Sequence, residues 1–196
     1  MEIKHPGELA AWLVPDVPAD PSQARFVFIL ESPHKEELKK KCPAAGTAGK
    51  AMARFILGDR NTAFGTLLLQ GQAGAAYAIV NVCQVPMQAS AYSGLGAAQK
   101  ALVARLQKMR NPELKSIDAA LYAAVLADLK ARLGRVNPKA KLIPCGKFAR
   151  KAYTNIYGAC PCDVPHPSFG NWHKKKYKAA MEQLKAELPA LRKEKP

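Results

Sequence analysis

The sequence predicts an α/β fold in which a parallel sheet is covered by helices on both faces. Continuous apolar runs rich in β-branched and aromatic residues occur at residues 25–30, 77–82 and 141–146, as is typical of buried parallel strands. Stretches with helical spacing of apolar residues separate these runs, which indicates βα units. We expect a three-layer αβα arrangement around a central sheet of four parallel strands, with a short fourth strand near residues 162–164.

The other elements follow in order along the chain. Residues 5–13 predict a short helix, and the proline-containing residues 14–23 predict a stiff connector. Apolar residues at three-and-four spacing predict helices at 97–109 and 116–133. Helices are also expected at 48–57 and 62–69, and at 147–153 after the turn at Gly146. A basic helix is expected at 174–188. Because 196 residues allow one well-buried core, we interpret residues 1–196 as a single domain with an N-terminal helix and linker (1–24) and a basic tail (189–196).

The charge of the chain predicts a polyanionic partner. There are 30 Lys and Arg residues against 15 Asp and Glu, which gives a formal net charge of +15. Nucleic acid is the first partner that this charge favours and an anionic membrane the second. No apolar run approaches the roughly 18–20 residues that a bilayer span requires, and residues 1–5 do not resemble the start of a secretory signal. We therefore expect a cytoplasmic protein that does not bind membranes.

The cysteines favour reduced thiols over disulfides. Their number is odd, and their spacing is not that of a disulfide framework. Free thiols in a reducing compartment are the first interpretation, and a metal or cluster site is the alternative. The five are Cys42, Cys83, Cys145, Cys160 and Cys162.

Polar residues stand where the predicted strands end. In open parallel sheets the ligand lies outside the carboxyl ends of the strands. Residues 31–34 follow the first strand, Asn81 ends the second, Gly146 follows the third, and residues 165–168 lie after the predicted fourth. The sequence therefore predicts that these residues converge on one rim.

Four segments at this rim resemble motifs of the uracil-DNA glycosylase superfamily. Residues 30–37 (LESPHKEE) resemble the motif G-E-A-P-G-x-x-E of its thermostable branch, and residues 46–52 (GTAGKAM) resemble G-x-A-G-x-x-L. Residues 79–82 (IVNV) are similar to the T-N-V segment, and His166–Ser168 match H-P-S. Residues 145–149 also fall where the family has a G-x-x-A turn. The resemblance covers residues 25–180 and implies a uracil-DNA glycosylase-like fold and a monomeric DNA glycosylase of base excision repair without a cofactor.

Glu31 and His166 form the predicted catalytic pair. Cleavage of a glycosidic bond places positive charge on the sugar and negative charge on the departing base, so a carboxylate and a hydrogen-bond donor stabilise the transition state. Glu31 would counter the sugar charge and orient water, and His166 would donate to the base oxygen, even when neutral. The alternatives are a Glu31 that caps a turn or pairs with Lys35, and a His166 that belongs only to a rigid turn.

Further residues are predicted to contact the flipped base. Asn81 offers a donor and an acceptor to the Watson–Crick edge of a pyrimidine, although an amide that satisfies a turn is the alternative. The resemblance places Ser32 and Pro33 in the first motif and His34 at the wall that faces the 5-position of the base. The family has a stacking Phe where Ala44 stands, so Phe64 is the candidate for a replacement ring.

A third group is predicted to contact DNA outside the pocket. Gly46 and Gly49 allow close approach of backbone to a phosphate, or only make a turn. Ser168 is similar to a family residue at the DNA backbone. Residues 169–172 occupy the place of the family's minor-groove loop, and a basic stretch follows, for which a solvated helix face is the alternative. The candidates in these residues are Phe169, Asn171, Trp172, Lys174 and Lys175.

Two departures from the family pattern leave other functions open. Leu30 and Ala44 replace a glycine and an aromatic residue of the motifs, which favours a catalytically inactive DNA- or RNA-binding protein on the same fold. A small-molecule enzyme of doubly wound architecture is the third interpretation, but no Gly-rich phosphate loop follows the first strand. The cysteines of the thermostable branch's iron–sulfur cluster are not matched, so we expect no cluster and no metal.

Overall fold

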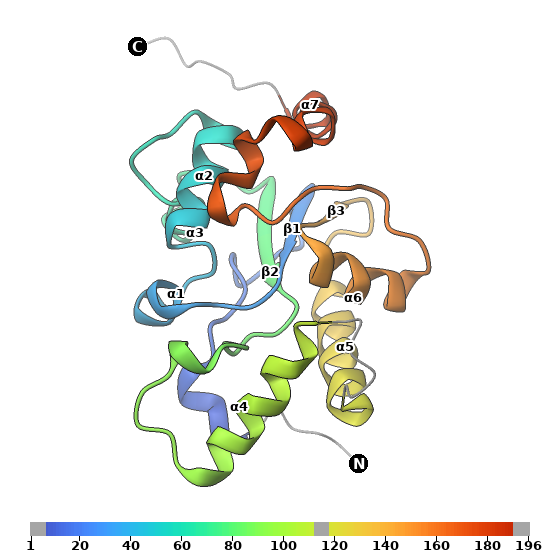
Figure 1. Ribbon diagram of the computed structural model, residues 1–196. Helices are drawn as coiled ribbons and strands as arrows, with labels where there is room; N and C mark the ends of the chain where they lie inside the picture. The colour runs from blue at the N-terminus through green and yellow to red at the C-terminus, as the bar shows by residue number, and fades with distance from the viewer. Residues whose placement is uncertain (1–6, 112–117, 190–196) are drawn as a thin grey trace.

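Three parallel strands form the sheet at the centre of the protein (Figure 1). The computed structural model describes residues 7–111 and 118–189. β1 (Phe26–Leu30) lies between β2 (Tyr77–Asn81) and β3 (Lys141–Pro144), and the register pairs Leu30 with Asn81 and Ile29 with Pro144. Every residue of β1 and β2 is buried, because helices cover both sides of the sheet. This burial explains why the two strands have no alternating polar positions.

Helices pack on both faces of the sheet, as predicted (Figure 1). Side chains alternate along β1, so that Phe26, Phe28 and Leu30 join one hydrophobic cluster while Val27 and Ile29 join the other. The first cluster includes residues of α2 (Thr47–Leu57), α3 (Phe64–Leu69) and α7 (Lys178–Glu187). The second includes residues of α4 (Ala97–Met109), α5 (Ala119–Leu133) and α6 (Lys147–Tyr157). The α/β class and these helices are confirmed.

The predicted fourth strand is wrong. Within the described residues the sheet has three strands, and residues 162–164 are irregular. Gly146 N donates to Val164 O at 2.9 Å, so this segment runs beside the end of β3. Pro161 and Pro165 flank it and have no N–H to donate, which prevents a ladder from continuing. The segment instead delivers His166 to the carboxyl end of the sheet.

Several helix boundaries also differ from the prediction. The first helix is a 3-10 helix, η1 (Gly7–Trp12), and the short helix α1 (Lys35–Lys40) was not predicted. α5 begins after Asp118, whose carboxylate accepts from Leu121 N at 2.9 Å, and residues 116–117 of the expected helix lie outside the described residues. The expected basic helix is divided into η4 (Lys175–Tyr177) and α7. Of the basic tail, residues 190–196 lie outside the described residues.

None of the helices in residues 7–111 and 118–189 is both long and apolar enough to cross a bilayer.

Candidate functional site

A cleft of about 520 Å³ lies where the strands end. The segment after β1, the first turn of α2, the end of α4 and η3 (Ser168–His173) all contribute to it. The structure thus brings together most of the predicted rim, as the rule for parallel sheets requires. The predicted residues that line the cleft are Glu31, Ser32, His34, Gly46, His166, Ser168, Phe169 and Asn171.

Glu31 is held at the cleft by its backbone and by an arginine. Cys83 N donates to Glu31 O at 3.1 Å, which extends the pairing of β1 and β2 by one residue. Arg110, at the end of α4, brings its Nε to 2.5 Å from Glu31 Oε1, and both side chains are partly exposed. Sequence reasoning missed Arg110, because nothing local connects the end of a helix with a strand end so far away in the chain. Arg110 fixes where the carboxylate points.

The hydrogen bonds of His166 define its tautomer. Ser168 N donates to Nδ1 at 3.2 Å, and Ser168 Oγ lies 2.8 Å from the same atom. A ring nitrogen that accepts from a backbone N–H carries no proton, so the neutral imidazole has its proton on Nε2. Ser168 therefore orients His166 and leaves Nε2–H as the donor of the ring.

Burial lowers the pKa of His166 below its ordinary value of 6.5. The nearby charge of Glu31 acts in the opposite direction, and that of Arg110 acts in the same direction as burial. Because a buried imidazole loses hydration when it is charged, the neutral form is favoured at neutral pH. The site can thus offer a neutral N–H donor.

This lowered pKa predicts a loss of stability in acid. The unfolded chain binds the proton at higher pH than the folded chain, so the contribution of His166 is complete above its unfolded pKa and falls as pH decreases through that value. We expect wild type to lose more unfolding free energy between about pH 7.5 and about pH 5.5 than His166→Gln does. Urea unfolding measures this, with exposed His173→Gln as the control; equal losses in wild type and His166→Gln would contradict it.

Gly146 leaves room for His166. It has φ +90°, and a Cβ on it would lie 2.8 Å from His166 Cβ and 3.3 Å from His166 N. The glycine of the family-like turn is therefore needed for both its backbone conformation and its close approach to the next segment. Its N–H also holds Val164 O, two residues before His166.

We expect Gly146→Ala to destabilise the protein more than a matched glycine change. Gly158 ends α6 with φ +92° and has open space around it, so Gly158→Ala tests the strain of positive φ alone. The clash with His166 should add a further loss of roughly 1–3 kcal/mol in unfolding free energy. Thermal unfolding of both variants checks this. Equal losses would mean that the contact with His166 relaxes freely.

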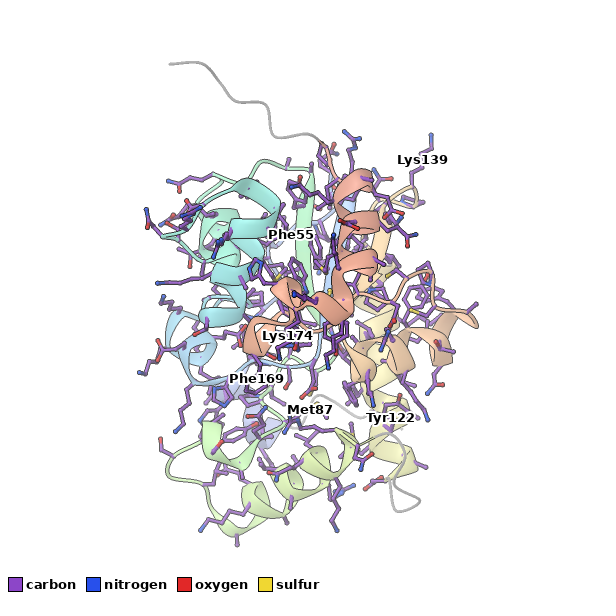
Figure 2. The ribbon with its side chains drawn as sticks, turned by 45° about the horizontal axis from the view of Figure 1, so that its top comes forward. Phe55, Met87, Tyr122, Lys139, Phe169 and Lys174 are labelled. Carbon is purple, nitrogen blue, oxygen red and sulfur yellow. The ribbon has the colours of Figure 1, made fainter. Side chains whose placement is uncertain are left out.

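Asn171 and Lys174 extend the support of His166. Asn171 Nδ2 donates to His166 O at 3.1 Å, and Lys174 Nζ donates to Asn171 Oδ1 at 2.9 Å. The amide thus joins the backbone of the histidine to a surface cation. Between His166 and Asn171 the chain turns at Phe169 and Gly170, which have φ +55° and +63°. The Phe169 side chain lines the cleft and is 86% exposed (Figure 2).

Asn81 is buried at the end of β2 without a partner for its side chain. Its exposed fraction is 1%, and neither Oδ1 nor Nδ2 has a hydrogen-bond partner among the described residues. It does not line the cleft surface itself. Alternation along β2 places it on the same face as Tyr77 and Ile79, which is also the face of α2, whose first turn lines the cleft. Such an amide costs free energy that a bound polar ligand would recover.

Other predicted contact residues lie in the core. Phe64 is 0% exposed and packs edge-on against Phe28, so it cannot stack on a base in this structure. Trp172 is 3% exposed, and its Nε1 donates to Pro165 O at 2.7 Å, so it is not an exposed wedge. Pro33 is buried as well. None of these three side chains lines the cleft.

Ala44 and Gly49 also pack inside the protein and do not line the cleft. Ala44 is 0% exposed in a turn with φ +50°, and a Cβ on Gly49 would lie 1.6 Å from Ala44 O. Gly49 therefore lets α2 pack closely against the turn at Ala44, whereas the predicted role of this glycine was close approach to DNA. Glu37 accepts from Ala44 N and, at 2.8 Å, from His34 N, so it ties the turn to the segment after β1. Burial raises the pKa of Glu37.

Searches among known proteins give no family for this chain. No family model matches it, and no curated protein matches it. Within the described part of the chain, no group of three or more His, Cys, Asp or Glu side chains is placed to hold a metal ion.

Proposed function

We propose that the protein is a monofunctional DNA glycosylase that hydrolyses the bond between deoxyribose and uracil, or a related damaged or modified pyrimidine, after the base is flipped out of DNA. The observation that carries the proposal is that a carboxylate, Glu31, and an oriented imidazole N–H, that of His166, line one cleft at the carboxyl end of the sheet. Such a pair matches the two charges that develop when a glycosidic bond breaks.

Each group has a defined part in the proposed reaction. As the bond between C1′ and the base nitrogen breaks, the electron pair leaves with the base, and His166 Nε2–H donates to the oxygen that becomes negative. The Glu31 carboxylate stabilises the positive sugar and accepts a proton from the water that attacks C1′. The products are an abasic site, whose new C1′ hydroxyl keeps one hydrogen of the water, and a free base, which receives the proton that Glu31 accepted, so that the carboxylate is restored. No lysine lines this cleft among the described residues, so a Schiff-base route is not proposed.

The surroundings support a flipped pyrimidine as the substrate. Asn81 ends β2 on the face of the sheet that α2 covers, and its buried amide, without a partner among the described residues, would read the base edge. Gly46 precedes the first turn of α2, where backbone N–H groups favour an anionic group. Phe169 is exposed at the rim and is the candidate side chain for the space that the flipped base leaves. Lys174 and Lys175 continue the surface as phosphate contacts.

Base release from a panel of oligonucleotides tests this proposal. The panel carries uracil, hypoxanthine, xanthine or 5-substituted uracil, and chromatography detects the free base. We expect wild type to release a pyrimidine, and His166→Ala to lower the rate roughly 100-fold or more because the donor to the base oxygen is lost. Gln72→Ala, at an exposed position outside the cleft, is the control. If wild type releases no base from any of these strands, the proposal is overturned.

A second candidate is a catalytically inactive nucleic-acid-binding protein. One observation favours it. Arg110 Nε lies 2.5 Å from Glu31 Oε1, so the arginine would compete with water and with the sugar for the carboxylate. Tight binding of the panel without release of any base would support this candidate.

A further inference from the structure

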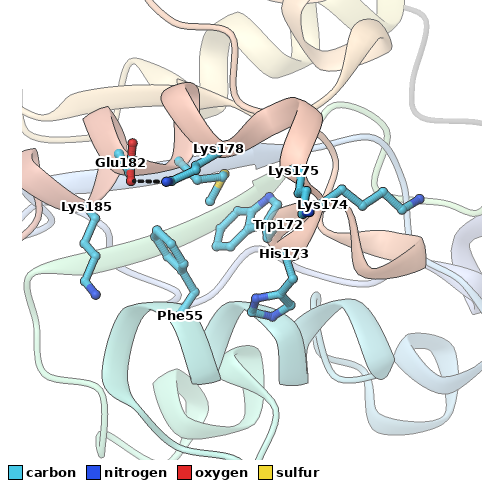
Figure 3. A pocket seen from close by; sticks show the side chains of 9 residues that line it. Phe55, Trp172, His173, Lys174, Lys175, Lys178, Glu182 and Lys185 are labelled. Atoms are coloured by element: carbon cyan, nitrogen blue, oxygen red, sulfur yellow. Dashed lines mark ion pairs between the residues drawn. The ribbon is translucent and has the colours of Figure 1, made fainter.

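A second groove lies next to the cleft, between α2 and the C-terminal segment (Figure 3). Its volume is about 300 Å³. Its floor is apolar and comes from Phe55, Trp172 and Met181. Its rim is polar and carries His173, Lys174, Lys175, Lys178, Glu182 and Lys185. The groove combines an aromatic surface with a row of cations.

Phe55 is the accessible ring of the floor. Trp172 is 3% exposed and lies beneath, with its ring centroid 5.2 Å from that of Phe55 and the planes at 73°. Phe55 is partly exposed and is held in place by this edge-on contact. A ring fixed in this way offers an apolar surface on which an unpaired base can stack, whatever its sequence.

The rim has an excess of positive charge. The rim carries four exposed lysines and one carboxylate, that of Glu182. Glu182 Oε1 lies 3.7 Å from Lys178 Nζ. Both members of this pair are mostly exposed, so it leaves the lysine available to another anion. Phosphates along a nucleic-acid strand are the anions that fit a row of lysines over an aromatic floor.

The groove and the cleft share one short segment. η3 contributes Ser168, Phe169 and Asn171 to the cleft and Trp172 and His173 to the groove. Lys174, on the rim of the groove, donates to Asn171 Oδ1, which in turn lies on the chain of bonds to His166 O. A strand bound in the groove therefore passes directly to the side of the cleft that holds the histidine.

We propose that this groove binds the single strand that flanks the base in the cleft, with one unpaired base on Phe55 and its phosphates on Lys178 and Lys185. This rests on the proposed function, since the cleft is taken to hold a base of the same strand. It makes single-stranded DNA the preferred partner over duplex DNA. The bases of a duplex are stacked on one another, so their faces are not free to stack on the ring of Phe55.

Binding of a labelled oligonucleotide without any damaged base tests the groove separately from catalysis. Fluorescence anisotropy gives Kd for single-stranded and duplex DNA over a range of salt. For single strands each phosphate contact contributes about 0.7 to the slope of log K against log salt, so Lys178→Ala/Lys185→Ala should lower the slope by about 1.4. Phe55→Leu keeps an apolar floor but removes the ring, and should weaken single-strand binding roughly 5- to 100-fold.

The matched control removes the same charge from the opposite face of the sheet. Lys100 and Lys130 are exposed on α4 and α5, outside the groove. Lys100→Ala/Lys130→Ala should therefore leave the salt slope of single-strand binding unchanged. Thermal unfolding verifies that all variants fold. Equal loss of slope in both double variants, or unchanged single-strand binding by Phe55→Leu, overturns the inference. Binding of phosphatidylserine vesicles but not of oligonucleotides overturns it in favour of a membrane partner.

The two proposals fail in different ways. If the groove variants weaken binding of undamaged single strands while no base is released from any strand, the groove is supported and the glycosylase function is overturned. If bases are released but groove and control variants bind alike, the groove inference alone is overturned.

Discussion

Glu31→Gln is expected to lower the rate of base release roughly 100-fold or more, while the affinity for a uracil-containing strand stays within about 3-fold. The amide retains the shape of the carboxylate but has no charge to stabilise the sugar and cannot accept the proton of water. Single-turnover release at saturating enzyme measures the chemical step, and anisotropy measures binding. Folding should change little, because the pair of Glu31 with Arg110 is partly exposed.

Glu8→Gln is the control for Glu31→Gln, because Glu8 is exposed on η1 and lies outside the cleft. It should release base at the wild-type rate. If Glu31→Gln also retains the wild-type rate, Glu31 does not stabilise the transition state, and the ion pair with Arg110 is its only role. If both affinity and rate are lost, the carboxylate is needed for binding rather than for chemistry.

Asn81→Leu is expected to remove base release and to stabilise the protein at the same time. The leucine keeps the branching of the asparagine side chain, although it is larger, and it cannot read the edge of a base. A site that lacks a required hydrogen bond loses several orders of magnitude in rate. Removal of a buried amide without a partner should raise the unfolding free energy by about 1–2 kcal/mol. A rise in Tm of roughly 2–4 °C per kcal/mol is expected for a chain of this size. Thermal unfolding and base release measure the two effects.

Gln84→Leu is the control for this change in stability. Gln84 is also buried, but its side chain is hydrogen-bonded to Asp16. Its replacement removes one hydrogen bond from the buried Asp16 carboxylate, which Arg132 still holds, and should therefore lower the unfolding free energy. If Asn81→Leu destabilises the protein as Gln84→Leu does, the Asn81 amide is satisfied within the fold. If Asn81→Leu retains base release, the amide does not read the base.

The sheet and most helices were predictable because their patterns are local. The apolar run at residues 26–30 is a buried strand, and α4 begins at Ala97 and ends at Met109 as its spacing indicates. The segment at 162–164 (Cys-Asp-Val) was not a strand, since a strand also needs backbone donors on its neighbours and the flanking prolines lack them. Whether such a segment joins a sheet depends on which strand it pairs with in the fold, and the periodicity of the sequence gives no information on that pairing.

The site was predictable only in part. The rule for strand ends placed Glu31 and His166 at one cleft, although they are far apart in sequence. It could not foresee Arg110, whose contact with Glu31 depends on how α4 lies against the sheet. Nor could it foresee that Ala44 and Phe64 turn into the core, because the turn at Ala44 has a left-handed backbone conformation that a sequence motif does not define.

Release of free base from a uracil-containing strand tests the central claim most directly. Wild type is incubated with the oligonucleotide, and mass spectrometry analyses both the strand and the small molecules. The proposed hydrolysis predicts free uracil and an intact strand with an abasic site. An unchanged uracil-containing strand, at enzyme concentrations that saturate it, would contradict the claim.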